Sequence, residues 1–122
     1  AACGLTNPSR PVTVRVSVRS EVDLPAWILG FGIETSSGQN IYGTNSRLLG
    51  VTLPPLRGAA SFDFTIPSMD VGEGSYTLHG ALADRDGAEV HRLLDAVGLA
   101  VIADGRETGF VHLRAELRPE RP

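Results

Sequence analysis

Hydrophobic and polar residues alternate along most of this chain. The clearest run covers residues 12–19, where four valines alternate with Thr, Arg, Ser and Arg. A repeat of two residues puts successive side chains on opposite faces of a strand, so this run predicts a half-buried β-strand. The same alternation returns at residues 27–34, 60–66 and 76–83. In each run the larger apolar residues share one face, which we expect to point into the core.

Turn signals separate these runs. Residues 36–39 (Ser-Ser-Gly-Gln) predict a turn with a short returning strand at Asn40–Asn45, and Pro67 ends the strand at 60–66. Residues 84–87 (Asp-Arg-Asp-Gly) are a hairpin signal. Residues 89–94 fit either a strand or one helical turn. We expect the strands at 99–103 and 110–118 to pair across a turn at 104–107.

These elements predict an all-β fold of eight or nine short strands. Each strand has one apolar side, so an antiparallel β-sandwich of two facing sheets is the economical arrangement, and a closed barrel is the alternative. The predicted sandwich covers residues 12–118. Residues 1–11 are expected to be an N-terminal extension, and residues 119–122 a C-terminal tail.

The composition then removes several classes of function. The 122 residues carry 14 acidic and 11 basic side chains, and the basic ones are arginines spread from Arg10 to Arg121. Nucleic-acid binding needs a clustered basic field, so we do not expect it. The longest nearly apolar stretches have eight residues, too few for a membrane span of about 20. The single cysteine, Cys3, allows no internal disulfide.

Catalytic and metal-binding patterns are also missing from the sequence. His79, His91 and His112 lie far apart, and none belongs to a short zinc-ligand pattern. No Gly-x-Ser-x-Gly run is present, and the loop Gly72-Glu73-Gly74 has an acid where a phosphate-binding loop needs amides. We therefore expect a binding or joining domain that is not an enzyme and has no cofactor or metal.

Several runs are similar to one known family. They are Gly30-Phe31-Gly32-Ile33, residues 38–46 (Gly-Gln-Asn-Ile-Tyr-Gly-Thr-Asn-Ser), residues 62–67 (Phe-Asp-Phe-Thr-Ile-Pro), residues 71–78 with Gly-Ser-Tyr-Thr-Leu, and residues 109–113 (Gly-Phe-Val-His-Leu). The chain resembles, over residues 12–117, the Wzt C-terminal family, which is the C-terminal domain of the ATPase subunit of polysaccharide-exporting ABC transporters. Two departures stand out: only eleven residues precede the first predicted strand, and the last strand ends in Leu117 where the family often has Trp.

The resemblance implies an immunoglobulin-like antiparallel β-sandwich with Greek-key or jelly-roll connections, often dimeric. It implies a domain that hangs from an ATPase at the cytoplasmic face of the bacterial inner membrane and recognises O-antigen or a related polysaccharide. Its partners would be the glycan, a second copy, and the ATPase and membrane subunits of the transporter. The apparent absence of a first strand also leaves an open sheet edge, which predicts a homodimer.

Glycan-binding residues must come from outward positions and loops, because inward positions are buried. Planar polar groups bind sugar hydroxyls, and aromatic faces lie against the C–H surface of the ring. The candidates are Tyr42 and Asn45 in the motif loop, Thr77 and His79 on one strand, and His112, Arg114 and Glu116 on the expected last strand. The alternative interpretation of these positions is a solvated face, and for Asn45 a residue that orders a bend.

Two other functions stay open at this point. One is a structural immunoglobulin-like module that only joins subunits. The other is a small secreted or lipid-anchored sandwich with an unknown ligand, because residues 1–4 (Ala-Ala-Cys-Gly) resemble the end of a lipoprotein processing site.

Overall fold

The computed structural model describes residues 3–6, 10–85, 89–92, 97–102 and 105–119. Within these residues the chain forms strands and no helix, which confirms the all-β prediction. The strands are β1 (Cys3–Thr6), β2 (Val12–Leu24), β3 (Trp27–Thr35), β4 (Asn40–Asn45), β5 (Leu56–Ile66), β6 (Gly74–Asp84), β7 (Glu89–Arg92) and β8 (Val97–Val101).

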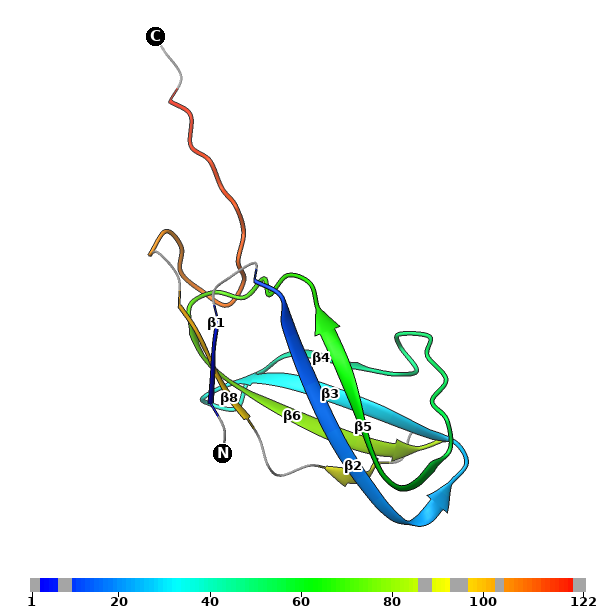
Figure 1. The fold of residues 1–122 in the computed structure, drawn as a ribbon. Helices are drawn as coiled ribbons and strands as arrows, with labels where there is room; N and C mark the ends of the chain where they lie inside the picture. The colour runs from blue at the N-terminus through cyan, green and yellow to red at the C-terminus, as the bar shows by residue number, and fades with distance from the viewer. Residues whose placement is uncertain (1–2, 7–9, 86–88, 93–96, 103–104, 120–122) are drawn as a thin grey trace.

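The strands form two sheets of unequal size that face each other (Figure 1). The larger sheet has six strands in the order β1-β8-β6-β3-β4, with β7 also paired to β6. The smaller sheet consists of β2 and β5. The predicted two-sheet architecture is therefore confirmed. One pair departs from the expected antiparallel arrangement, because β1 runs parallel to β8.

The core is built on β3, which lies between β6 and β4. Its alternate residues Trp27, Leu29, Phe31 and Ile33 are buried, and Leu29 and Ile33 are each 1% exposed. Inward residues of β6 and β8 join this cluster, as the alternation in the sequence predicts. The indole Nε1 of Trp27 donates a hydrogen bond to the carbonyl of Pro54, 2.9 Å away, so the buried ring has no unpaired polar atom.

The smaller sheet covers this core incompletely. The inward residues Phe62 and Phe64 of β5 were predicted to be core, yet they are only half-buried. Phe64 packs on Phe31 with ring centroids 4.6 Å apart, and Phe62 meets Trp27 edge-on at 5.4 Å. Because only two strands face a sheet of six, the outer side of these rings is left without a neighbouring strand.

The outward face of the smaller sheet is polar. The guanidinium of Arg15 donates to both carboxylate oxygens of Asp63 across the β2–β5 pair, at 2.9 and 3.2 Å. This hydrogen bonding lowers the pKa of Asp63 and raises that of Arg15. Where β2 bulges after Ser20, the opposite residue Gly58 takes a φ of 71°, a conformation that glycine adopts without strain.

The two ends of the chain differ from the sequence prediction. Residues 1–11 were expected to be an extension, but Cys3–Thr6 form β1 beside β8, so a strand does precede β2. The expected strand at 110–118 is wrong: apart from an isolated bridge between Val111 and Val71, this segment pairs with no strand. Its expected partner β8 has β1 on one side and β6 on the other, so no free edge remains for it.

The ambiguous segment at 89–94 is resolved in part. Glu89–Arg92 is the strand β7, which pairs antiparallel with β6, whereas residues 93 and 94 lie outside the described residues. The same holds for residues 86–88 of the predicted hairpin turn, although β6 and β7 on either side of it pair as a hairpin requires. The predicted turn at 36–39 and the strand Asn40–Asn45 are confirmed.

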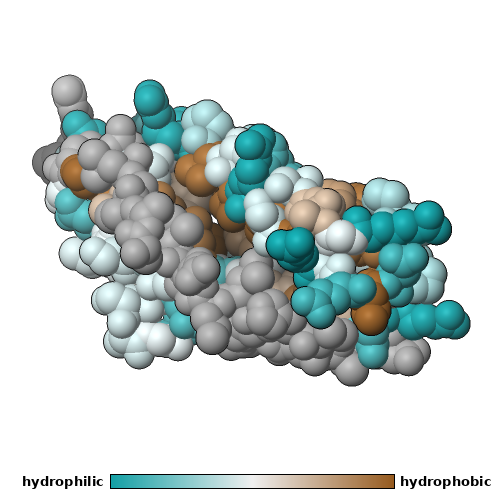
Figure 2. All heavy atoms as spheres, turned by 60° about the horizontal axis from the view of Figure 1, so that its bottom comes forward, coloured by the Kyte–Doolittle hydropathy of each residue, from teal (hydrophilic) through white to brown (hydrophobic). Residues whose placement is uncertain are grey.

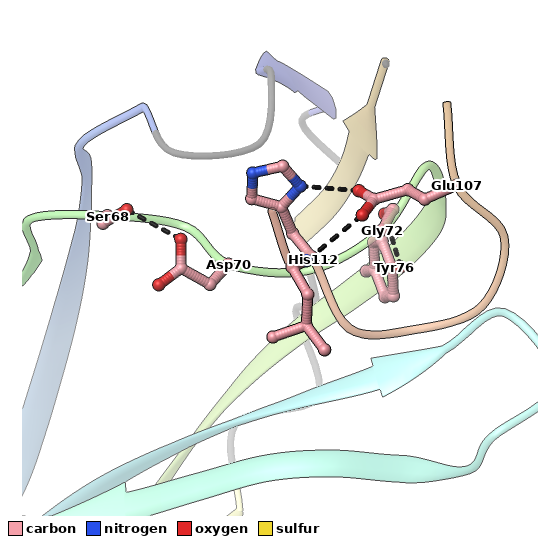
Figure 3. A network of polar contacts seen from close by, with 7 residues as sticks. Ser68, Asp70, Gly72, Tyr76, Glu107 and His112 are labelled. Carbon is pink, nitrogen blue, oxygen red and sulfur yellow. Dashed lines mark hydrogen bonds and ion pairs between the residues drawn. The ribbon is translucent and has the colours of Figure 1, made fainter. Parts of the chain in front are cut away.

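The C-terminal segment is held to the body at one place (Figure 3). The amide of His112 donates to the carbonyl of Asp70 and that of Gly72 to the carbonyl of Phe110, both at 3.0 Å. The carboxylate of Glu107 contacts the same segment through both oxygens. One oxygen lies 2.6 Å from His112 Nδ1, and the other accepts a hydrogen bond from the Leu113 amide at 3.1 Å. Beyond this anchor the chain extends away from both sheets (Figure 1).

Gly72 is the point of closest approach in this anchor. Its carbonyl accepts a 2.7 Å hydrogen bond from the buried hydroxyl of Tyr76, and burial raises the pKa of that phenol. A Cβ added at Gly72 would collide with the carbonyl oxygen of Gly109. Only glycine therefore lets the loop before β6 lie directly against the C-terminal segment.

We expect Gly72→Ala to detach the C-terminal segment from the loop. Hydrogen–deuterium exchange of the His112 amide should speed up by about fivefold, the effect of losing a hydrogen bond worth about 1 kcal/mol. Gly43→Ala is the matched control, because the nearest atom to its added Cβ is 4.0 Å away. Equal exchange rates in Gly72→Ala and the parent would contradict the anchor.

Candidate functional site

The outward face of the larger sheet carries a groove of about 440 Å³. It lies over β3, β4 and β6, and the turn after β4 adds one residue to it. The lining residues are Ile28, Gly30, Phe31, Gly32, Glu34, Asn40, Gly43, Thr44, Asn45, Leu48, His79, Ala81 and Ala83.

The groove exists because the outward residues of the central strands are small. Gly30 and Gly32 alternate with the large core residues of β3, and Ala81 lies opposite Gly30 on β6. A Cβ at Gly32 would lie 2.8 Å from the Cε1 and Nε2 atoms of His79, so the imidazole rests directly over the glycine backbone. A Cβ at Gly30 would lie 3.1 Å from the carbonyl oxygen of Thr44. The imidazole of His79 and the carbonyl of Thr44 therefore take up the space beside these two glycines and form part of the surface that a ligand would meet.

Polar side chains line one part of the groove, next to these small residues. The Nδ1 atom of His79 is 3.6 Å from Oε1 of Glu34, and the two side chains are 17% and 30% exposed. Asn40 lies opposite Glu34 in the β3–β4 register and also lines the groove. An imidazole, a carboxylate and an amide together offer planar donors and acceptors, which suit a ligand rich in hydroxyl groups.

Asn45 has a structural role in addition to its place in the groove. Its side-chain oxygen accepts a 2.8 Å hydrogen bond from the amide of Leu48, and its carbonyl accepts one from Leu49 at 3.0 Å. These bonds order the turn that follows β4, as the alternative interpretation of the sequence proposed. The amide nitrogen of its side chain is the group it offers to a ligand.

The structure brings some of the sequence candidates together and separates others. Asn45 and His79 both line the groove. Thr77 lies two residues before His79 on the same face, opposite Glu34, but does not line the groove. Tyr42 belongs to β4, and its ring packs on Phe31 at 5.8 Å, so it lies on the core side of the sheet edge.

The remaining candidates lie away from the groove. His112, Arg114 and Glu116 were placed on the outer face of a last strand, which the structure does not contain. His112 is paired with Glu107 in the anchor, whereas Arg114 is exposed in the extended segment. Glu116 forms an exposed ion pair with Arg118 at 3.3 Å. These three residues do not share a face with His79.

Three polar residues of the groove were missed from the sequence: Glu34, Asn40 and Thr44. The alternation at 27–34 already put Glu34 on the outward face with Gly30 and Gly32. The two glycines on this outward face could have indicated the site. Glycines that alternate with large apolar residues along a strand indicate a place where another group approaches the backbone.

The described part of the chain contains neither a cluster of metal-ligating residues nor a membrane-spanning helix. No group of three or more His, Cys, Asp or Glu residues there is placed to hold a metal ion. No helix among those residues has the length and apolar character that crossing a bilayer requires.

Comparison with known proteins places this fold. A solved structure of the C-terminal domain of Wzt has a TM-score of 0.76 and 24% identity, and the alignment covers 96% of this chain and 74% of that one. The CARDB domain of a Pyrococcus furiosus protein, solved in complex with di-metal ions, has a TM-score of 0.51 and 13% identity, with 85% and 89% of the two chains covered. Both likenesses show the fold alone. Curated protein sequences give no match.

The family comparison covers nearly the whole chain. The model of the Wzt C-terminal domain matches residues 4–113, which include every strand from β2 to β8 and most of β1. The match agrees with the resemblance carried by the motifs of β3, β4 and β6. The chain therefore belongs to the Wzt C-terminal domain family.

Proposed function

We propose that this domain binds a polysaccharide, O-antigen or a related glycan, for export by an ABC transporter. Membership of the Wzt C-terminal domain family supports the transporter role. In the proposal, the domain is not an enzyme, and ATP hydrolysis belongs to another domain of the full-length protein. The transporter would hold it at the cytoplasmic face of the bacterial inner membrane, with the ATPase and membrane subunits as partners.

The observation that carries the proposal is the composition of the groove. Sugars present hydroxyl groups at their edges and C–H groups on their faces, so they need polar groups beside an apolar surface. His79 and Glu34 supply the polar groups, while the small residues Gly43 and Ala81 leave room for a sugar ring beside them. The groove crosses three strands, β3, β4 and β6, so the groups that meet the glycan come from all three.

We expect His79→Ala to weaken binding of O-polysaccharide purified from the source bacterium. Loss of one hydrogen bond to a sugar hydroxyl costs about 1–3 kcal/mol, or roughly 5- to 150-fold in Kd. Isothermal titration calorimetry measures the change, and thermal unfolding checks that the variant is folded.

His112→Ala is the matched control for this experiment. It removes the same side chain from the C-terminal anchor, outside the groove, and should leave the Kd unchanged. If His112→Ala weakens binding and His79→Ala does not, the glycan binds near the C-terminal segment and the groove assignment is wrong.

A second role, assembly, is favoured by the C-terminal segment. Its apolar residues keep the alternation of a strand, and Val111, Leu113 and Leu117 are 59%, 72% and 93% exposed. Among the described residues no third strand pairs with the sheet of β2 and β5, and its inward residues Phe62 and Phe64 are half-buried. On the surface seen in Figure 2, hydrophobic residues appear in separate places among hydrophilic ones.

We propose a homodimer in which the C-terminal segment of one copy adds a strand to the smaller sheet of the other. An added strand would pair the free N–H and C=O groups at the sheet edge and cover the half-buried rings. The sequence predicted a dimer through the sheet edge left open by a missing first strand. That reason does not hold, because β1 is present and pairs with β8.

Sedimentation of the full chain tests the dimer. At micromolar concentration the molar mass of the parent from sedimentation should be twice 12.9 kDa. Removal of residues 114–122 should give a monomer. Arg114→Ser is the control and should leave the dimer intact, since its side chain alternates with the apolar ones. A parent that stays monomeric at high micromolar concentration would rule out this assembly.

A further inference from the structure

A second hollow lies beside the groove, at the end of the sandwich. It has a volume of about 350 Å³. Its lining residues are Pro25, Ala26, Trp27, Ile28, Ser46, Arg47, Gly50, Val51, Thr52, Leu53 and Arg85. Ile28 lines both hollows, and the turn after β4 separates them, with Leu48 on the groove and Arg47 on the second pocket. A ligand that fills the groove therefore lies next to this pocket.

The wall that carries Arg47 is an ordered turn. The amide of Val51 donates to the carbonyl of Ser46 at 2.9 Å, and that of Gly50 to the carbonyl of Arg47 at 3.1 Å. The hydroxyl of Ser46 is itself fixed, because it accepts a 3.1 Å hydrogen bond from the amide of Leu29 in the core. Gly50 has a φ of 72°, which closes the turn. The position of Arg47 is thus set by the backbone.

Two arginines line the pocket, and no Asp or Glu is among its lining residues. Arg47 donates from Nη2 to the backbone carbonyl of Arg85, so its guanidinium lies against the main chain of the second arginine. Within the described residues, neither guanidinium forms an ion pair with a carboxylate, and no Asp or Glu lines the pocket. Arg15 and Arg57 differ, because they pair with Asp63 at 2.9 Å and Asp23 at 3.8 Å.

Apart from the hydroxyl residues Ser46 and Thr52, the rest of the pocket is lined by apolar residues and a glycine. Trp27 is 6% exposed and is held by its hydrogen bond to Pro54. Val51 and Leu53 add aliphatic surface beside it. Guanidinium groups bind carboxylates and phosphates through parallel N–H donors, so each arginine at this pocket can contribute donors to an anion. The apolar wall fits the non-polar body of a molecule whose charged group meets the arginines.

We infer that Arg47 and Arg85 form a subsite for an oxyanion, the carboxylate or phosphate group of an acidic sugar. Together with the groove, the subsite selects a polysaccharide that carries an acidic substituent next to the neutral sugars bound over β3 and β6. This second statement rests on the proposed function. The oxyanion subsite itself does not, since it follows from the pocket alone.

The fluorescence of Trp27 tests the subsite directly. Trp27 is the only tryptophan of the chain and lines this pocket and not the groove, so its emission reports on the pocket. The probes are D-glucuronate, D-glucose 6-phosphate and neutral D-glucose, titrated at constant ionic strength. The two acidic sugars should change the emission saturably, and glucose should not. The tighter of the two identifies a carboxylate or a phosphate as the preferred group.

Substitutions then assign the effect to the arginines. Arg85→Gln should raise the Kd of the better acidic probe at least tenfold, and so should Arg47→Gln. Arg85→Gln is the decisive variant, because its guanidinium forms none of the hydrogen bonds that hold the turn. Arg57→Gln is the control and should bind as the parent does. Unchanged Trp27 emission with both acidic sugars, or equal Kd values in the parent and Arg85→Gln, would overturn the inference.

The same variants separate this inference from the proposed function. If acidic sugars bind at Trp27 but purified polysaccharide does not bind the domain, the subsite stands and the glycan-export proposal fails. If polysaccharide binding depends on His79 but not on Arg85, the groove stands and the selection of an acidic polysaccharide through the subsite is wrong.

Discussion

The antiparallel pairing of β3 with β6 is the interaction on which the rest of the structure depends. The two strands stay in register over nine residues, from the pair of Trp27 with Asp84 to the pair of Thr35 with Tyr76. This register puts the large core residues of both strands on one face: Trp27, Leu29, Phe31 and Ile33 of β3 with Tyr76, Leu78 and Leu82 of β6. It also aligns Gly32 with His79 on the other face. One set of hydrogen bonds therefore produces both the hydrophobic core and the groove.

The unequal size of the two sheets is a second constraint. The inward residues of β3, β6 and β8 are buried, whereas Phe62 and Phe64 of the two-stranded sheet are half-buried. The same chain ends in a segment with strand-like alternation and no strand partner. If that segment added to the smaller sheet of a second copy, it would gain a strand partner and would also cover the half-buried phenylalanines. In the dimer that we propose, assembly therefore completes the burial of the hydrophobic core.

Most of the fold could be predicted from the sequence, because its alternation is strong. The runs at 12–19 and 76–83 predicted which side chains are buried in β2 and β6, and Gly38 marked the turn before β4. Local patterns did not show pairings between distant segments. They did not indicate that Cys3–Thr6 lies parallel to β8, or that residues 110–118 find no partner within the chain. Strand pairing depends on which edges the other strands leave free.

The candidate site was predicted less completely. The alternation of apolar and polar residues correctly put His79 on an outward face. It could not distinguish that face from the other polar surfaces of the molecule. The groove depends on three strands that meet only in the folded sheet, and on glycines whose role is to leave space. His112 and Arg114 were chosen on a strand that the chain does not form. Residue types alone therefore suggested several faces, and only the register of β3 with β4 and β6 selected one.

The most direct test of the account is to locate the bound glycan by NMR on the isotope-labelled domain. Chemical-shift changes on addition of the purified polysaccharide should be largest at the amides of Gly30 and Gly32 and at the His79 ring, because these groups form the groove. Amides on the polar face of β2 and β5, such as those of Ser17 and Ser61, should stay unchanged. Shifts confined to β2 and β5, with none on β3 and β6, would contradict the account.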